Sequence, residues 1–211
     1  MSKSILLLDG QWEHRRFHDL RCFFICPKKA IICDMNLKSE RNNVAYIDGA
    51  NLHRGVASFG WRLDYKRFRV WLSEKYQVRL AYLFMGLITK YGDFYKRLQE
   101  WGHTLVFKEV VYDKEGKPKG NCDADLVLQA VCDIYEQKFG NALVVASDGD
   151  YASLVKFLLQ KQKLWAVLSP REKEKCSILL KRTGAKIAYL NDQRSILENQ
   201  KEKAPDGDGT P

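Results

Sequence analysis

Residues 142–154 read Ala-Leu-Val-Val-Ala-Ser-Asp-Gly-Asp-Tyr-Ala-Ser-Leu, and this stretch decides the fold. Its apolar start is too short for a helix and ends abruptly at two carboxylates and a glycine. That pattern is typical of a buried strand that delivers acidic groups to the edge of a sheet. After Asp150 the apolar residues recur at helical spacing through Leu159. Residues 147–150 are therefore predicted to form a strand-to-helix junction, where open α/β sheets place their chemistry.

A second strand that stops at a carboxylate lies earlier in the chain. Residues 44–47 are apolar, and Asp48 follows them directly. Asn51 comes one helical turn after Asp48. Elsewhere strands and helices alternate in the hydrophobic pattern. The predicted strands span residues 44–47, 78–84, 104–111, 142–146, 164–168 and 185–190, and the predicted helices span residues 52–57, 65–76, 93–101, 123–135, 152–159 and 173–182.

This alternation predicts an α/β fold, with a central, mostly parallel sheet between two layers of helices. In a sheet ordered 3-2-1-4-5, the strands that end at Asp48 and Asp148 are neighbours at the point where the strand order reverses. No Gly-x-Gly-x-x-Gly motif follows the first strand, and no Gly-x4-Gly-Lys-Ser/Thr motif occurs in the chain. The sequence therefore lacks the motifs that would indicate dinucleotide binding or P-loop phosphate transfer.

The 211 residues, 45% of them hydrophobic, suit one well-cored domain with tails. We expect residues 41–190 to form the domain, residues 1–40 a poorly structured N-terminal extension, and residues 191–211 a disordered polar tail. Met35 precedes the first regular strand, which raises the hypothesis that residues 1–34 lie upstream of the true start. His18, Cys22 and Cys26 form only one arm of a metal clip, whereas structural zinc usually takes paired ligands from two arms.

The formal net charge is +9, and this excess lies within residues 41–189. A basic domain with acids concentrated at turns suggests a polyanionic partner that is handled at an acidic, metal-binding centre. The net charge by itself is explained equally well by a basic surface that only keeps the protein soluble. We find no signal sequence and no apolar run of transmembrane length, so we expect a cytoplasmic protein without a membrane partner.

Four aspartates are candidates for that acidic centre. Asp48 ends the first strand, Asp148 and Asp150 follow the fourth, and Asp123 begins the helix before it, with Asn121 as the expected cap. Such a cluster raises the pKa values of its members unless a cation compensates the charge. Mg²⁺ takes a few carboxylate oxygens and keeps waters, which suits hydrolysis of a phosphodiester by a metal-activated water.

The alternative for each carboxylate is a helix cap or first-turn acid, which explains a lone aspartate well but three strand-end aspartates poorly. Asp125 and Asp133 fit that structural alternative better, because Asp133 lies well inside its helix. Asn51 and Ser147 are expected to orient a carboxylate or phosphate. Gly149 is expected to let the backbone approach the site.

Three motifs together are specific to one family: Ile-Asp-Gly-Ala-Asn at residues 47–51, Lys-Gly-Asn-Cys-Asp at 119–123, and Ala-Ser-Asp-Gly-Asp-Tyr at 146–151. In this order and spacing they resemble the NYN domain of the PIN-like nuclease superfamily. The resemblance covers about residues 42–190. It implies a PIN-like, Rossmann-like three-layer α/β/α fold and a Mg²⁺- or Mn²⁺-dependent ribonuclease.

By motif, the resemblance assigns catalytic roles to Asp48, Asn51, Asp123, Asp148 and Asp150. The four aspartates are the implied metal ligands. Cys122 stands where the family usually has an apolar residue. Asp125 adds an acid that is either a fifth ligand or a surface residue.

RNA is the polyanion that the family implies, and a single strand can lie in a metal cleft. The candidate RNA-binding residues lie in the loop before Asp123 and after the second strand: Lys114, Lys117, Lys119, Lys96 and Arg97. Arg171, Lys173 and Lys175 form a further candidate rim. Each of these basic residues is also explained as part of a solvated surface.

Two functions remain open from the sequence. The first is a metal-dependent ribonuclease, which we expect to be endonucleolytic, and the second is a non-catalytic RNA-binding or regulatory module of the same fold. A phosphohydrolase acting on small esters is a third, weaker reading. The sequence leaves the RNA target and the oligomeric state open, with a homodimer among the options.

Overall fold

The computed structural model describes residues 42–109, 111–112, 118–119 and 122–199, all of them within the compact unit Leu37–Pro211. Of the described residues, six strands form one sheet in the order β3-β2-β1-β6-β7-β8, and every neighbouring pair is parallel. The strands are β1 (Asn43–Asp48), β2 (Val78–Gly86), β3 (His103–Lys108), β6 (Ala142–Val145), β7 (Leu164–Ser169) and β8 (Ile187–Tyr189). The predicted strand order is confirmed.

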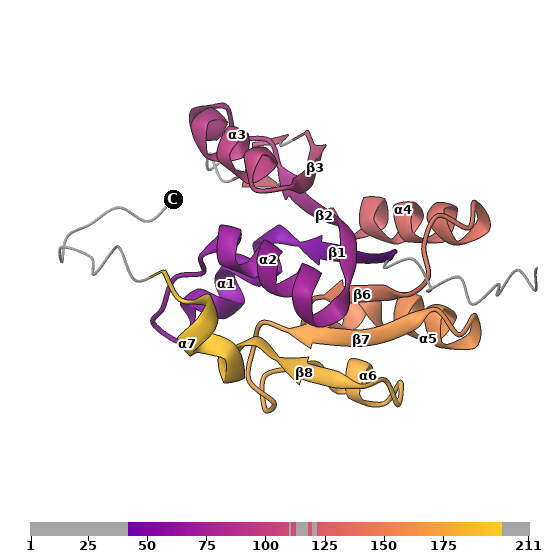
Figure 1. The fold of residues 1–211 in the computed structure, drawn as a ribbon. Helices are drawn as coiled ribbons and strands as arrows, with labels where there is room; N and C mark the ends of the chain where they lie inside the picture. Colours follow the sequence, from indigo (N-terminus) through magenta and orange to yellow (C-terminus); the bar gives the residue numbers. More distant parts are fainter. Residues whose placement is uncertain (1–41, 110, 113–117, 120–121, 200–211) are drawn as a thin grey trace, which may run out of the picture. The chain divides into compact units, whose positions relative to one another are not determined.

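Helices cover both faces of the sheet (Figure 1). One hydrophobic core contains side chains of α1, α2, α3 and α7, and the other contains side chains of α4, α5 and α6. The helices are α1 (Gly49–Ala57), α2 (Tyr65–Tyr76), α3 (Gly92–Glu100), α4 (Asp123–Tyr135), α5 (Ala152–Gln160), α6 (Ile178–Lys181) and α7 (Arg194–Leu197), with short 3-10 turns η1 (Thr89–Tyr91), η2 (Gly149–Tyr151) and η3 (Leu190–Gln193). The predicted three-layer α/β/α architecture is therefore confirmed.

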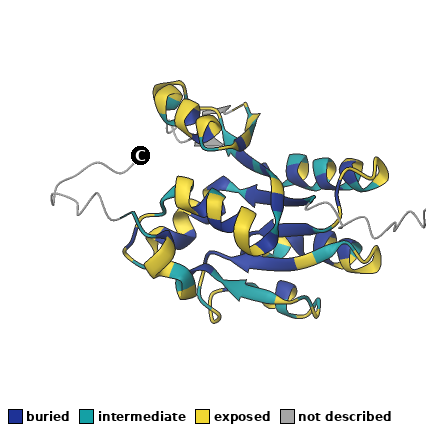
Figure 2. Cartoon of the chain, in the orientation of Figure 1, coloured by how far each residue is buried: buried dark blue, intermediate teal, exposed yellow. Residues whose placement is uncertain are grey.

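The alternation of side chains along β1 explains how one strand serves two cores. Ala45 and Ile47 lie in the first core, whereas Val44 and Tyr46 lie in the second, because successive side chains of a strand point to opposite faces. All four side chains are buried. Figure 2 shows that burial concentrates in the strands, while exposed residues lie on the outer sides of the helices.

The chain beyond Asn191 differs from the expected tail as far as residue 199. Leu197 of α7 is fully buried, the backbone N–H of Asp64 donates to the Leu197 carbonyl oxygen at 2.8 Å, and Leu63 pairs with Glu198. The polar composition did not indicate this segment, because only one of its side chains, that of Leu197, is buried. Residues 200–211 lie outside the described residues, as do residues 1–41.

Three other local predictions were wrong. The predicted helix 173–182 is shorter in the structure, where α6 spans Ile178–Lys181. Ser177 is its N-cap, and the Ser177 side chain accepts from the Leu179 N–H at 3.2 Å. The third strand ends at Lys108, and the loop after it contains the antiparallel pair β4 (Val111–Tyr112) and β5 (Pro118–Lys119). Cys122, with no side-chain cap bond, occupies the cap position of α4, and Asn121 lies outside the described residues.

None of the helices in the described part of the chain combines the length and the apolar character that a bilayer-spanning helix needs.

Candidate active site

The carboxyl ends of β1 and β6 place two acidic segments side by side. The parallel register pairs Ile47 with Val145, so Asp48 and residues 147–150 leave the sheet at the same edge. α4, which begins at Asp123, packs against both β1 and η2. The fold therefore brings the aspartates of the three sequence motifs to one edge.

Asp48 both caps a helix and belongs to the acidic site. Its Oδ1 accepts from the backbone N–H of Asn51 at 2.9 Å, which caps α1, and its Oδ2 accepts from the Tyr151 hydroxyl at 3.0 Å. Burial raises the pKa of Asp48, and the negative charge of Asp123 adds to this rise. The two hydrogen bonds and the positive charge of Arg54 act in the opposite direction. The net effect is a raised pKa, so these partners offset only part of the cost of burying the ionised Asp48 carboxylate.

Tyr151 connects Asp48 to Asp123. The Tyr151 side chain is fully buried, and its hydroxyl is also within hydrogen-bond distance of Asp123 Oδ1. Burial, followed by the charge of Asp48, raises the pKa of Tyr151, so the phenol stays protonated. Two of the predicted acids therefore converge on one hydroxyl group.

Asp148 and Asp150 are more open to solvent. Both are exposed, and Asp148 Oδ1 accepts from the backbone N–H of Asp150 at 3.3 Å, which caps η2. Within the described part of the chain, no three His, Cys, Asp or Glu side chains form a group that could hold a metal ion. The structure thus assembles the pair Asp48–Asp123, and it leaves Asp148 and Asp150 in the adjacent loop.

Asn51 and Ser147 hold the two acidic segments together. Asn51 Oδ1 accepts from both the backbone N–H and the hydroxyl of Ser147, each at 2.9 Å, and all three groups are buried. The same Asn51 donates its backbone N–H to Asp48. The amide oxygen is therefore occupied in fixing the loop before Asp148. A carboxylate or phosphate would accept from the amide NH2 group instead, so the expected orienting role of Asn51 stays a prediction.

Gly149 serves packing within the protein. A Cβ at this position would lie 2.6 Å from the Ser177 hydroxyl oxygen and 3.1 Å from a methyl carbon of Leu179. The backbone of η2 therefore approaches the start of α6 closely, and only glycine allows this contact. This packing explains the glycine by itself, and the expected approach of its backbone to the site stays a prediction.

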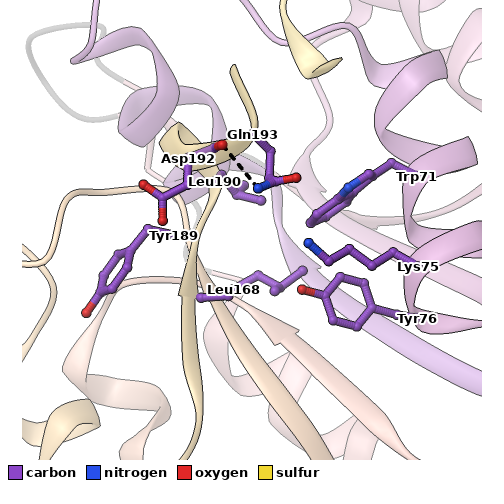
Figure 3. Close-up of a pocket in the computed structure, with 9 residues that line it drawn as sticks. Trp71, Lys75, Tyr76, Leu168, Tyr189, Leu190, Asp192 and Gln193 are labelled. Carbon is purple, nitrogen blue, oxygen red and sulfur yellow. Dashed lines mark hydrogen bonds between the residues drawn. The ribbon is translucent and has the colours of Figure 1, made fainter. Parts of the chain in front are cut away.

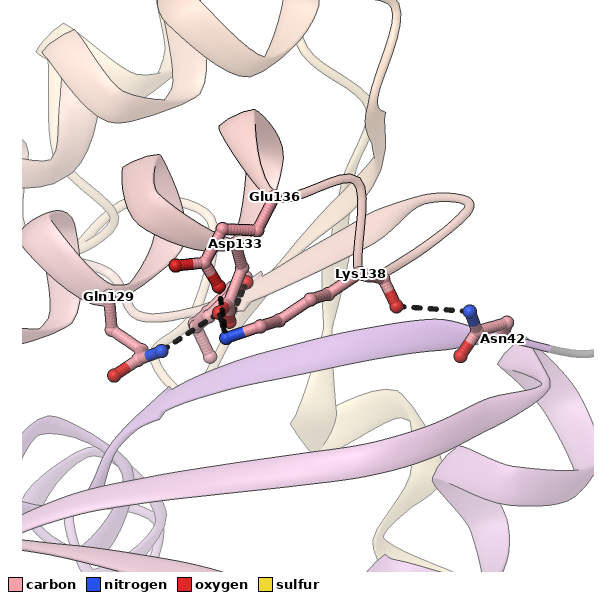
Figure 4. A network of polar contacts seen from close by, with 6 residues as sticks. Asn42, Gln129, Asp133, Glu136 and Lys138 are labelled. Atoms are coloured by element: carbon pink, nitrogen blue, oxygen red, sulfur yellow. Dashed lines mark hydrogen bonds and ion pairs between the residues drawn. The ribbon is translucent and has the colours of Figure 1, made fainter.

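The remaining acids of α4 have other partners. Asp125 forms an ion pair with Lys108 at the end of β3, with 2.9 Å between Oδ2 and Nζ, so it has a cation of its own. Asp133 is buried and accepts from the Tyr46 hydroxyl at 2.9 Å and from the Gln129 amide at 2.8 Å. Lys138 lies 3.2 Å from Asp133, and this network ties α4 to β1 (Figure 4).

Some of the candidate RNA-binding residues lie within the described part of the chain, and others lie outside it. Lys96 and Arg97 are exposed on α3, and Arg171 and Lys173 are exposed after β7. Lys175 is paired with Glu172 at 2.7 Å. Lys114 and Lys117 lie outside the described residues, as does the side chain of Lys119, so their assignment to RNA binding stays a prediction.

Sequence reasoning missed two residues that contribute to the site. Tyr151 follows Asp150 directly, but a tyrosine after a strand-end motif was indistinguishable from a core aromatic. Arg54 lies six residues after Asp48, and its spacing on α1 was a usable signal. Cys122 is a third neighbour: burial raises the pKa of its thiol to about 11, and the Asp48 charge adds to this effect, so the thiol stays protonated.

A separate cavity of about 220 Å³ lies beside α2 and η3 (Figure 3). The Lys75 ammonium sits 5.1 Å from the centroid of the Trp71 ring and 5.8 Å from that of Tyr76, and all three residues line the cavity. None of the predicted catalytic residues is among its described lining residues. This cavity is therefore not the acidic site.

The donor set at the sheet edge fits a hard divalent cation. Mg²⁺ in proteins is commonly held by one or two carboxylates and keeps several waters. Asp48 and Asp123 meet at one hydroxyl oxygen and provide such a pair. The fit rests on these two carboxylates, with exposed Asp148 in the neighbouring loop.

Comparisons with known proteins agree with this architecture. The family model described as NYN domain matches residues 43–190. A solved structure of a protein of unknown function from Vibrio parahaemolyticus is similar with a TM-score of 0.61 and 19% sequence identity, covering 75% of this chain and 97% of that one. This structural likeness concerns the fold alone. No curated protein matches the chain.

Proposed function

The chain belongs to the NYN domain family, and from this premise we propose that it is a metal-dependent ribonuclease that hydrolyses phosphodiester bonds of single-stranded RNA. Family membership itself indicates a nuclease-like function connected with RNA. The observation that carries the finer proposal is the convergence of Asp48 and Asp123 on one hydroxyl at the carboxyl edge of a parallel sheet. Open α/β sheets bind their ligands at this edge.

Each residue of the site has its own role in the proposed reaction. Asp48 and Asp123 would hold Mg²⁺ or Mn²⁺, and the exposed carboxylate of Asp148 faces the solvent from which a phosphate and water arrive. A bound divalent cation supplies an activated water and neutralises charge on the phosphate. Asn51 and Ser147 keep the Asp148 loop next to Asp48.

The basic surface supports an RNA substrate. Arg171 and Lys173 are exposed in the segment between β7 and α6, and α6 packs against η2. Arg54 lies on α1 close enough to stabilise the charge on Asp48. Basic side chains that surround an acidic centre attract the phosphate backbone toward it.

A cleavage assay on single-stranded RNA tests the proposal. We expect Mg²⁺ or Mn²⁺ to support cleavage, EDTA to stop it, and Asp48→Asn to reduce it at least 100-fold, because the variant removes a ligand charge and keeps the shape. Asp93→Asn is the matched control, since Asp93 is an exposed aspartate on α3.

Cleavage by Asp48→Asn at the wild-type rate would contradict the proposal. Salt-sensitive RNA binding that leaves the RNA intact with every metal would instead identify the non-catalytic, RNA-binding alternative.

A further inference from the structure

One buried hydroxyl serves two carboxylates from different elements. Tyr151 Oη lies 3.0 Å from Oδ2 of Asp48, at the end of β1, and it is also hydrogen-bonded to Oδ1 of Asp123, at the start of α4. A tyrosine hydroxyl carries a single proton and can donate to only one acceptor at a time. Two carboxylate oxygens therefore face each other across one neutral oxygen atom.

The Asp48 and Asp123 carboxylates repel each other at close range, so a further interaction must offset this repulsion. A hydroxyl that donates to a carboxylate forms a charge-assisted hydrogen bond, which is about twice as strong as a neutral one. The Tyr151 ring is fully buried in the core beneath α4 and α5, so the hydroxyl has little freedom to leave. It thereby fixes the separation of Asp48 and Asp123 without any cation.

We propose that Tyr151 is a positioning residue that takes the place of the divalent cation in the metal-free protein. Its hydroxyl, which donates to one of the two carboxylates at a time, holds Asp48 and Asp123 together, and cation binding displaces it from at least one of them. This inference rests on the proposed function, because it concerns the same pair of carboxylates. It assigns to Tyr151 a role toward the cation that is separate from packing.

The proposal has a thermodynamic consequence that a packing role lacks. A contact made only in the metal-free state stabilises that state against the metal-bound one, and its removal must tighten cation binding by the same factor. Hydrogen bonds to charged groups contribute about 1.5–3 kcal/mol, so the affinity gain is roughly tenfold or more. The metal-free protein should lose stability, and the metal-loaded protein should not.

The test compares Tyr151→Phe with a matched variant, Tyr46→Phe. Tyr46 is also fully buried in the same core, and its hydroxyl donates to a carboxylate, that of Asp133, at 2.9 Å. Mn²⁺ affinity is measured by electron paramagnetic resonance, and melting temperature is measured in EDTA and in saturating Mn²⁺. Neither readout depends on nuclease activity.

We expect Tyr151→Phe to bind Mn²⁺ roughly tenfold more tightly than the wild type and to melt lower only in EDTA. Tyr46→Phe should melt lower in both conditions, with unchanged Mn²⁺ affinity. Equal or weaker Mn²⁺ binding by Tyr151→Phe overturns the inference and leaves the proposed function intact. Failure of the wild type to bind Mn²⁺ at all overturns both.

A measurement on the wild type covers the case in which Tyr151→Phe does not fold. With tyrosine labelled at the ring carbon that bears the hydroxyl, Mg²⁺ titration should shift the nuclear magnetic resonance signal of Tyr151 and leave that of Tyr46 unchanged. A Tyr151 signal that does not move as Mg²⁺ saturates the protein overturns the inference.

Discussion

At the scale of single residues, the site is held by a few buried polar groups with fixed partners. Asp48 caps α1 and accepts from Tyr151, while Asn51 accepts twice from Ser147. Each of these side chains joins two elements, so the geometry at the sheet edge does not depend on exposed side chains. Asp48 therefore contributes to the stability of the fold as well as to the candidate site.

The Asn51 bridge gives a prediction about stability and activity together. Asn51→Ala leaves the buried N–H and hydroxyl of Ser147 without their acceptor, which costs about 2 kcal/mol in the free energy of unfolding. Urea unfolding measures this loss. Cleavage should fall because the Asp148 loop loses its anchor, and Ala50→Ser, at the exposed neighbouring position, should change neither quantity.

His103 predicts a pH dependence of stability. It is buried, its Nε2 donates to the Tyr65 carbonyl oxygen at 3.0 Å, and its Nδ1 has no hydrogen-bond partner. Burial lowers the pKa of His103, so the unfolded chain takes up a proton more readily than the folded one. The contribution of neutral His103 to the free energy of unfolding is thus fully present above the pKa of about 6.5 that histidine has in the unfolded chain, and it is lost as the pH falls below that value.

Melting temperature between pH 7.5 and 5 checks this. The wild type should lose more stability over this interval than His103→Gln, which cannot take up the proton. An identical pH dependence of the two proteins would show that His103 does not contribute.

At the scale of elements, the helices differ in how they are fixed to the sheet. α4 is fixed by the polar network around Asp133 and by the Lys108–Asp125 ion pair. α7 is fixed by one buried leucine and by backbone hydrogen bonds near α2. The attachments of α4 position Asp123 at the start of that helix, and those of α7 keep Leu197 in the first core.

For α4, Asp133→Ala should be strongly destabilising. The substitution leaves the Tyr46 hydroxyl buried without its acceptor and removes one of the two acidic partners of Lys138, which keeps Glu136, at a cost of about 3 kcal/mol. Urea denaturation compares it with Asp93→Ala, an exposed aspartate on α3 that should be neutral. A loss below about 1 kcal/mol for Asp133→Ala would mean that the network does not secure α4.

For α7, two adjacent residues give a matched pair. Leu197 is fully buried, whereas Ile196 is 51% exposed. Leu197→Ala should cost about 3 kcal/mol, and Ile196→Ala should cost less than about 1 kcal/mol. Equal, small effects would contradict the placement of α7 in the domain core.

The sequence predicted the elements that have strong periodicity, and with them the strand order. Asp48 and Asp148 were predicted to share an edge because parallel strands end together, and the register of β1 with β6 confirms this. α7 was missed because a four-residue helix has too few apolar positions to show a period. The role of Tyr151 was hidden because it depends on the packing of α4, which no local pattern reports.

At the scale of the whole molecule, a net charge of +9 is combined with an acidic edge. Such a distribution attracts a polyanion broadly and offers a cation site locally. RNA binding should therefore weaken roughly 20-fold as salt rises from 50 to 200 mM, if about three phosphates of a single strand are neutralised. Fluorescence anisotropy with Asp48→Asn in EDTA measures binding without cleavage.

A charge reversal locates the binding face. Lys173→Glu, between β7 and α6, should weaken RNA binding. Lys66→Glu on α2, a helix that covers the other face of the sheet, should have a smaller effect. Equal effects of the two reversals would place the RNA elsewhere or show only diffuse attraction.

The most direct test of the central claim is the cleavage rate of a labelled single-stranded RNA by the wild type and by Asp123→Asn, with Mg²⁺ and with EDTA. Asparagine keeps an oxygen that can accept from Tyr151, so the fold is maintained while one ligand charge is lost. The account predicts Mg²⁺-dependent cleavage by the wild type and at least a 100-fold loss in the variant. Cleavage that persists in EDTA, or that survives Asp123→Asn unchanged, would contradict it.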